Sequence, residues 1–200
     1  LYALLESINL YAKNVHKTMV IYRSDKAYEA GYLVVSKAFK EVNFMKQGNQ
    51  PRNDFKPLTL QAFTATDAPY VVFAVDDIVV KDTFDCAECA ALLEKEHAYG
   101  FYLRLGFNLS ECYALGSCKQ ALPSLQKVRN CEDVYEWVFD QAVLDWAYPN
   151  TVDMTLYRKK DIDGAVRGLG YYSPNTFEGN WHGQAQSVIK RRGLCFSVSK

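Results

Sequence analysis

The chain has 200 residues, of which 49% are hydrophobic and 14% aromatic, and this favours a folded domain with a sizeable core over a disordered chain. Its 23 basic and 23 acidic side chains balance, so no basic field indicates a nucleic-acid partner. No apolar stretch reaches the length of a membrane span, and we expect a cytoplasmic location with no membrane span in this segment.

Helix and strand patterns alternate along the chain. Helices are predicted over residues 1–13, 24–39, 54–64 and 84–96 and from about residue 176 onward. Strands are predicted over residues 18–22, 42–45, 70–75, 99–104, 135–139, 153–158 and 193–197, while residues 47–53 and 106–133 have loop character. This alternation predicts an α/β, Rossmann-like fold with a mostly parallel sheet flanked by helices.

The chain begins at Leu1 inside an amphipathic pattern and stops soon after a strand-like run. No repeat, linker or low-complexity tract interrupts it. We therefore expect residues 1–200 to form one domain that is truncated at both ends.

The most informative stretch is the apolar run from Tyr70 to Val75, which is followed directly by Asp76 and Asp77. The run is typical of a strand buried on both faces, and open α/β sheets bind ligands at the carboxyl ends of such strands. Two carboxylates at that place suit a hard divalent cation held against phosphate oxygens. The alternative is an acidic turn without a ligand.

Basic residues that could meet a phosphate follow a Gly-bearing loop. Arg52 and Lys56 flank the start of the predicted third helix, where backbone N–H groups favour anions, and Arg191 and Arg192 lie in a C-terminal turn. Each of them is otherwise a solvated surface charge. Asp25, after the second predicted element, either hydrogen-bonds a nucleotide base or caps the helix that follows.

The six cysteines, including the Cys86 and Cys89 pair, show no zinc-site spacing, because no second pair follows. The predicted helix over residues 84–96 places that pair on one face. We expect scattered buried thiols in a reducing compartment.

Three segments together resemble the GT-A glycosyltransferase fold, in particular its family-2-like enzymes. The first runs from Gly48 through the acid pair, the second is Thr151 to Lys160, and the third is Asn175 to Trp181 with the basic turn Lys190 to Gly193. The likeness spans most of the chain, and the order and spacing of the motifs are more specific than any one of them.

The chain departs from that family at three places. The usual Asp-x-Asp motif is here Val75, Asp76 and Asp77, and Glu178 is followed by Gly179 where the family often has Glu-Asp. The family's first strand, with its nucleotide-facing loop, would lie before Leu1. These departures leave open an incomplete site or an inactive relative.

The resemblance implies a metal-dependent transfer of a sugar, with inversion, from a nucleotide-diphosphate sugar to an unknown acceptor, which is a glycan, a lipid-linked glycan or a protein. Asp77 would contact Mn²⁺ or Mg²⁺, and Asp76 would face the ribose or a metal-bound water. His182 would be a further metal ligand, as in some GT-A enzymes; a lone histidine is more often a packing residue.

Glu178 is the candidate general base of an inverting transfer, and Asp153 competes with it for that role. Glu178 has aromatic neighbours, Phe177 and Trp181, that suit shielding or a sugar platform, although a Glu at a helix N-terminus after Asn175 or Thr176 also complements the helix dipole. Asp153 lies in a strand, where a lone carboxylate needs a partner, and either acts as the base or holds the acceptor.

Asp145, next to Trp146, suits a carbohydrate site or a loop acid beside a core tryptophan. Two other functions remain open. One is nucleotidyl transfer, which also needs acids, a metal and a phosphate loop. The other is a non-catalytic carbohydrate- or partner-binding domain on the same scaffold.

Overall fold

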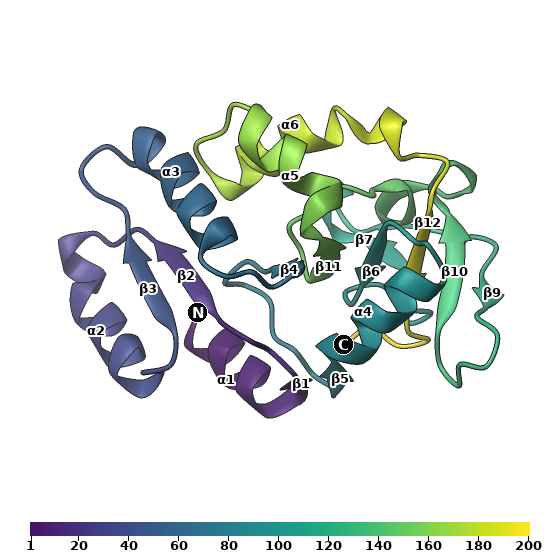
Figure 1. The fold of residues 1–200 in the computed structure, drawn as a ribbon, viewed down its shortest axis with the longest axis horizontal. Helices are drawn as coiled ribbons and strands as arrows, with labels where there is room; N and C mark the ends of the chain where they lie inside the picture. The colour runs from purple at the N-terminus through teal and green to yellow at the C-terminus, as the bar shows by residue number, and fades with distance from the viewer.

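The computed structural model describes residues 1–200 and contains a central six-stranded sheet between helices (Figure 1). The helices are α1 (Tyr2–Tyr11), α2 (Glu29–Ala38), α3 (Pro51–Thr64), α4 (Cys86–Lys95), α5 (Lys159–Gly168) and α6 (Pro174–His182). The strands of the central sheet are, in spatial order, β4 (Tyr70–Phe73), β11 (Thr155–Arg158), β6 (Gly100–Tyr102), β12 (Arg192–Cys195), β10 (Tyr135–Val138) and β9 (Gln126–Lys127).

Three small two-stranded ladders complete the fold. β2 (Met19–Tyr22) pairs with β3 (Asn43–Lys46) in parallel, β1 (Ala12–Lys13) pairs with β5 (Phe84–Asp85) in parallel, and β7 (Glu111–Cys112) pairs with β8 (Cys118–Lys119) antiparallel. The β2–β3 ladder and α2 stand at one end of the molecule (Figure 1). No ladder joins β2 to β4.

The α/β class with flanking helices is confirmed, and the sheet is mixed. β4, β6, β12 and β9 run in one direction, whereas β11 and β10 run against them. Because the two reversed strands lie between the others, β6 and β12 form the only parallel pair of neighbours in this sheet.

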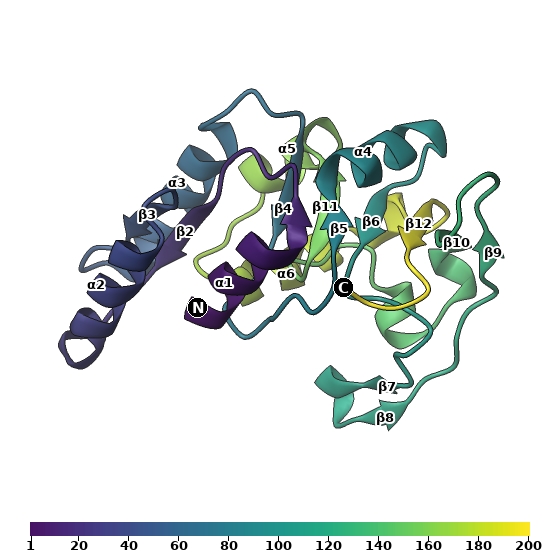
Figure 2. The same ribbon diagram turned by 90° about the horizontal axis from the view of Figure 1, so that it is seen from below.

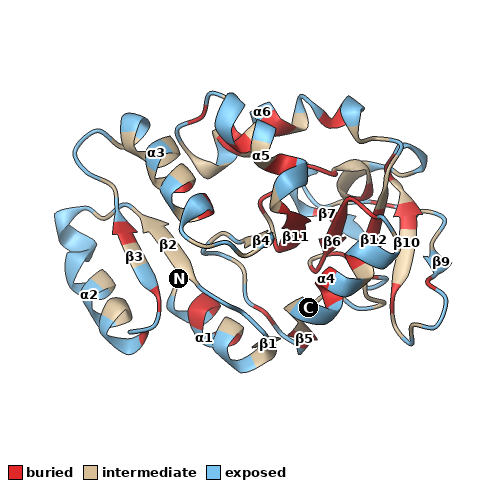
Figure 3. Cartoon of the chain, viewed as in Figure 1, coloured by how far each residue is buried: buried red, intermediate tan, exposed pale blue.

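Each face of the sheet carries its own hydrophobic layer, because side chains of a strand alternate between faces. Tyr102 and Tyr157 point into the layer covered by α5 and α6, which includes Trp137 and Trp146. The adjacent residues Phe101, Leu156 and Leu194 point into the layer covered by α4. In Figure 3 the central strands β6, β11 and β12 are correspondingly coloured as buried.

One predicted feature of β4 is wrong. The strand ends at Phe73, and its four residues are half-buried, not buried on both faces. The reason is its place in the sheet: β4 pairs only with β11, so its other edge is unpaired and its side chains retain part of their exposure.

Several helix starts differ from the prediction. α2 begins at Glu29 rather than at residue 24, because Lys26–Tyr28 form a 3₁₀ helix. α3 begins at Pro51, since proline is well suited to the first helical turn, so Arg52 lies inside the helix. α6 is capped by Ser173, whose side chain and that of Thr176 form a capping box, and not by Asn175 or Thr176. The helix α5 was not predicted at all.

None of the helices combines the length and the apolar character needed to cross a membrane.

Candidate functional site

Three chain segments that carry charged residues lie at the same end of the strands of the central sheet. β4 and β6 run in the same direction, so Asp77 after β4 and Arg104 after β6 follow the same ends of their strands. β11 runs against both, so Asp153, two residues before its start, lies at that end of the strands too. The sheet topology therefore gathers an acid turn, an arginine and a second acid, as expected where such sheets bind ligands.

The acid pair occupies a turn beyond β4. The N–H of Ile78 donates to the carbonyl of Val75 at 3.2 Å, which closes the turn with Asp76 and Asp77 at its two central positions. Both side chains are exposed. Both carboxylates are therefore accessible from solvent.

A cavity of about 370 Å³ follows β2 and is lined by Arg23, Ser24, Asp25, Tyr28 and Tyr32. The ring of Tyr32 stacks on that of Tyr22, with 4.6 Å between centroids. Burial raises the pKa of Tyr32, and the negative charge of Asp76 raises it further. The acid turn thus lies beside this cavity.

Asp25 does not cap the following helical segment with its side chain. The N–H of Tyr28 donates to the backbone carbonyl of Asp25 at 2.9 Å, and no cap hydrogen bond to the carboxylate is present. The structure therefore excludes a side-chain cap by Asp25 and places this residue in the cavity wall.

Glu178 is anchored to the loop that precedes β11. One oxygen, Oε1, accepts hydrogen bonds from the hydroxyl of Thr151 at 2.7 Å and from the N–H of Val152 at 2.9 Å. The Thr151 hydroxyl in turn accepts from the N–H of Asp153 at 3.1 Å. Glu178 lies in the second turn of α6, beyond the first turn where a carboxylate best complements the helix dipole.

Asp153 lies in a strained, half-buried segment. The next residue, Met154, has φ of 38°, a left-handed conformation that is uncommon outside glycine. Its carbonyl accepts from the N–H of Leu103 at 2.9 Å, which ties the segment to the end of β6. Backbone strain of this kind is often found at functional sites.

The pKa of Asp153 is raised above the ordinary value of an aspartate. Burial is the main cause, and the charge of Glu178 adds to it. Arg104 acts in the opposite direction, while Asp77 and Asp145 raise the pKa further. Charges from the acid turn, from Glu178 on α6 and from Arg104 therefore all influence the pKa of the Asp153 carboxyl. A carboxylate with a raised pKa is a stronger proton acceptor, which suits a general base near neutral pH.

Arg104 belongs to a polar network that sequence reasoning missed. Its Nη1 lies 3.2 Å from Oδ1 of Asp145, and the amide of Gln120 donates to Oδ2 of the same carboxylate at 2.9 Å. Nε of Arg104 is buried without a partner. A lone arginine gives no sequence signal here, because its acidic partner lies 41 residues further along the chain.

The aromatic residues near these acids are structural. Trp146 is fully buried and packs in the core, so the interpretation as a loop acid beside a core tryptophan holds for Asp145 and Trp146. Phe177 and Trp181 are each 2% exposed, which excludes them as an open sugar platform.

His182 stacks on Tyr148, with 3.9 Å between the ring centroids. Burial lowers the pKa of His182, and the charge of Glu178 opposes the shift. Its Nδ1 is buried without a partner. The structure does not gather Asp76, Asp77 and His182 into one group, because no cluster of three or more potential metal ligands is present.

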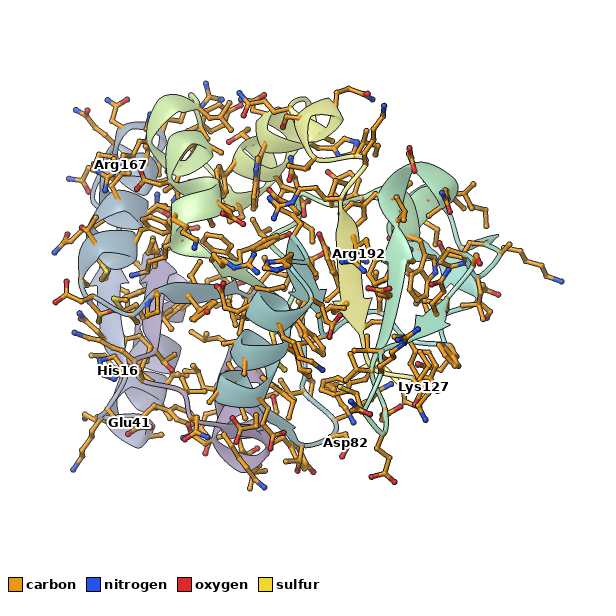
Figure 4. The ribbon with its side chains drawn as sticks, turned by 45° about the vertical axis from the view of Figure 1, so that its right-hand side comes forward. His16, Glu41, Asp82, Lys127, Arg167 and Arg192 are labelled. Carbon is orange, nitrogen blue, oxygen red and sulfur yellow. The ribbon has the colours of Figure 1, made fainter.

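The basic residues predicted for a phosphate are occupied elsewhere. Nζ of Lys56 donates to the carbonyl of Leu169 at 2.6 Å, and Arg52 lies over the ring of Tyr172 at 5.2 Å. Arg192, which is labelled in Figure 4, forms an ion pair with Glu136 on β10. These contacts join α3 to the segment before α6, and β12 to β10.

A curated protein and a solved structure are similar to this chain. A bifunctional glycosyltransferase, pgtA of Dictyostelium discoideum, is 29% identical over 196 residues, an alignment that covers 88% of this chain and 24% of the relative. The chain therefore spans about a quarter of that relative's length. Residues 1–349 of S. aureus TarS share 13% identity and a TM-score of 0.49, over 98% of this chain and 53% of that one. No family model matches the chain.

Proposed function

We propose that this chain is a glycosyltransferase domain that moves a sugar from a nucleotide-diphosphate sugar to an acceptor hydroxyl, with inversion at the anomeric carbon. The observation that carries the proposal is the placement of Asp77, Asp153 and Arg104 at the same end of neighbouring strands, with Glu178 hydrogen-bonded to the segment that precedes Asp153. The similarity to a glycosyltransferase supports it.

The donor lies across the acid turn. Its nucleoside enters the cavity lined by Arg23, Asp25 and Tyr32, where Asp25 accepts a hydrogen bond from the base or ribose. The diphosphate then lies next to the acid turn, where the charge of Asp76 acts on Tyr32 of the cavity wall.

Mn²⁺ or Mg²⁺ fits the acid turn, because such ions are commonly bound by one or two carboxylates together with substrate phosphates. Asp77 and Asp76 are two exposed oxygen donors of this kind. When bound, the ion would neutralise the charge that develops on the leaving diphosphate. His182 is the weaker candidate ligand, since its ring packs on Tyr148.

Asp153 is the general base. Its carboxylate takes the proton of the acceptor hydroxyl as the oxygen attacks the anomeric carbon from the side opposite to the diphosphate, which inverts the configuration. Glu178 is the second candidate, but its Oε1 already accepts two hydrogen bonds from the Thr151–Val152 segment. We assign Glu178 to holding that segment, so that it positions Asp153.

The acceptor hydroxyl belongs to a glycan, a lipid-linked glycan or a protein. The polar network of Arg104, Asp145 and Gln120 suits a ligand rich in hydroxyl groups.

The test is a calorimetric titration of nucleoside diphosphates, with and without Mn²⁺. We expect one nucleotide to bind in a metal-dependent manner and Asp77→Asn to abolish the metal dependence. Asp67→Asn is the matched control, since Asp67 is an exposed acid before the opposite end of β4. Equal binding by wild type and Asp77→Asn, or no nucleotide binding at all, would contradict the donor site.

A further inference from the structure

The β7–β8 hairpin holds two cysteines directly opposite each other. Cys112 on β7 and Cys118 on β8 are register partners in the antiparallel ladder, next to the pair Glu111 and Lys119. The N–H of Gln120 donates to the carbonyl of Ser110 at 2.9 Å, which continues the same register beyond the ladder. The two thiols therefore share one face of the hairpin.

The spacing of such a pair matches that of a disulfide. Opposite residues of an antiparallel ladder have Cα atoms about 4.5–5.5 Å apart, and disulfides span Cα separations of about 4.4–6.8 Å. The turn between the strands is set by two left-handed residues, Gly116 with φ of 72° and Ser117 with φ of 56°. The backbone register of the pair is therefore compatible with a disulfide.

The two thiols differ in access. Cys112 is 3% exposed, and burial raises its pKa. Cys118 is half-exposed, on a hairpin that projects from the body of the protein (Figure 2). The tip between them exposes Tyr113 by 89% and Leu115 by 62%. An oxidant can therefore reach Cys118 first.

We infer that Cys112 and Cys118 form a redox pair, which a small-molecule disulfide such as oxidised glutathione converts to a disulfide across the hairpin. The Cys118 thiolate attacks one sulfur of oxidised glutathione, the S–S bond of the glutathione breaks, and one reduced glutathione leaves. Cys112 gives its proton to solvent and attacks the Cys118 sulfur, releasing a second glutathione. Two protein thiols are oxidised, and one glutathione disulfide is reduced to two thiols.

The cysteine pair lies next to the polar network of Arg104, Asp145 and Gln120. The charge of Asp145 contributes to the raised pKa of Cys112, so the thiol lies near that carboxylate. Gln120, directly after β8, binds both Asp145 and the carbonyl of Glu111. A disulfide would stiffen the hairpin next to the Arg104–Asp145 pair. The pairing of the cysteines does not depend on the proposed sugar transfer.

In the test, the folded chain is incubated in glutathione buffers with an increasing fraction of oxidised glutathione. Each sample is quenched with acid, its free thiols are alkylated, and the protein is digested with trypsin. Both cysteines fall in the tryptic peptide from Leu105 to Lys119. We expect this peptide to become lighter by two hydrogens and to resist alkylation. In Cys112→Ser, Cys118 should instead keep a bound glutathione, because no second thiol displaces it.

Cys131→Ser is the matched control, since Cys131 is half-exposed and lies outside the hairpin, and it should leave the result unchanged. The inference is overturned if the wild-type peptide stays alkylated at both cysteines at every glutathione ratio. It is equally overturned if Cys118 of the wild type keeps a glutathione, or if either cysteine bonds to another cysteine of the chain.

Discussion

The central sheet and the β2–β3 unit are built from similar apolar strands but are stabilised to different extents. Two core clusters, of 15 and 13 buried residues, cover the two faces of the central sheet. The N-terminal cluster beneath α1 and α2 contains only Leu5, Phe39 and Val42. α2 has no buried residue, and Figure 3 shows it largely exposed or half-exposed.

This difference separates the two halves of the proposed site. Asp153 and Arg104 lie at the ends of strands of the well-packed sheet, and Glu178 lies on the helix α6 that covers it. The cavity lined by Arg23 and Tyr32 belongs instead to the sparsely packed unit. Regions with few buried apolar contacts open locally at lower free energy. We therefore expect Asp153, Glu178 and Arg104 to be held rigidly, and the cavity proposed for the nucleotide to change its conformation more easily.

The largest change in stability is expected from Gly193→Ala in the central sheet. A Cβ at Gly193 would lie 2.6 Å from the ring of Trp137 and 2.9 Å from that of Phe139, both rings in the core. Overpacking of this kind should lower the free energy of unfolding by about 3 kcal/mol. Chemical denaturation monitored by tryptophan fluorescence measures it, and an unchanged midpoint would show that the sheet core is looser than its packing indicates.

A moderate effect is expected from Asp85→Ala, where the two regions meet. The carboxylate of Asp85 caps α4 by accepting from the N–H of Ala87 and of Glu88, and it accepts from Nδ2 of Asn14 at 2.7 Å. Loss of the cap should cost about 1 kcal/mol. Hydrogen exchange should then increase in both α4 and α1, and an increase in α4 alone would show that the contact with Asn14 does not couple the regions.

A smaller effect, of opposite sign, is expected from Gly31→Ala in α2. A Cβ at this position meets no atom within 4 Å, so the substitution removes chain entropy from the unfolded state without a clash. The gain should be roughly 0.5–1 kcal/mol, seen as slower hydrogen exchange in α2. If exchange in the central sheet slowed equally, the two regions would unfold as one unit.

The smallest effect is a pH dependence of stability from Asp153, whose carboxyl is only partly buried. Its pKa is raised in the folded state, so the native protein binds this proton more tightly than the unfolded chain. The stabilising contribution is complete below the ordinary aspartate pKa of about 3.9 and is lost as the pH rises through the raised value. The Tm of Asp153→Asn minus the Tm of wild type should therefore be larger at pH 7 than at pH 4. A constant or falling difference would contradict the pKa direction.

Much of the fold was predictable from sequence, because apolar periodicity identifies strands and helices locally. The periodicity gave α1, α4 and most strands within a few residues. It missed α5, since that helix follows β11 without a turn and begins with Lys159 and Lys160, charges that oppose the helix dipole. Half-burial of β4 was not predictable, because it depends on which strand edges remain unpaired.

The candidate site was likewise predictable only in part. Asp153 and Glu178 were identified from local sequence, and the structure brings them together through Thr151. Arg104 was missed because its role depends on Asp145 far along the chain. Arg52 and Lys56 were assigned to phosphate from their place at a helix start, yet they contact the segment from Leu169 to Tyr172 instead.

The most direct measurement is the release of nucleoside diphosphate from a panel of nucleotide sugars by wild type and by Asp153→Asn. The account predicts that wild type releases one nucleoside diphosphate in the presence of Mn²⁺ or Mg²⁺. Asp153→Asn should lose about 10²- to 10⁴-fold in rate, as expected for removal of a general base, while nucleotide binding measured by calorimetry is unchanged. Release at the wild-type rate by Asp153→Asn, or none by wild type with any nucleotide sugar, would contradict it.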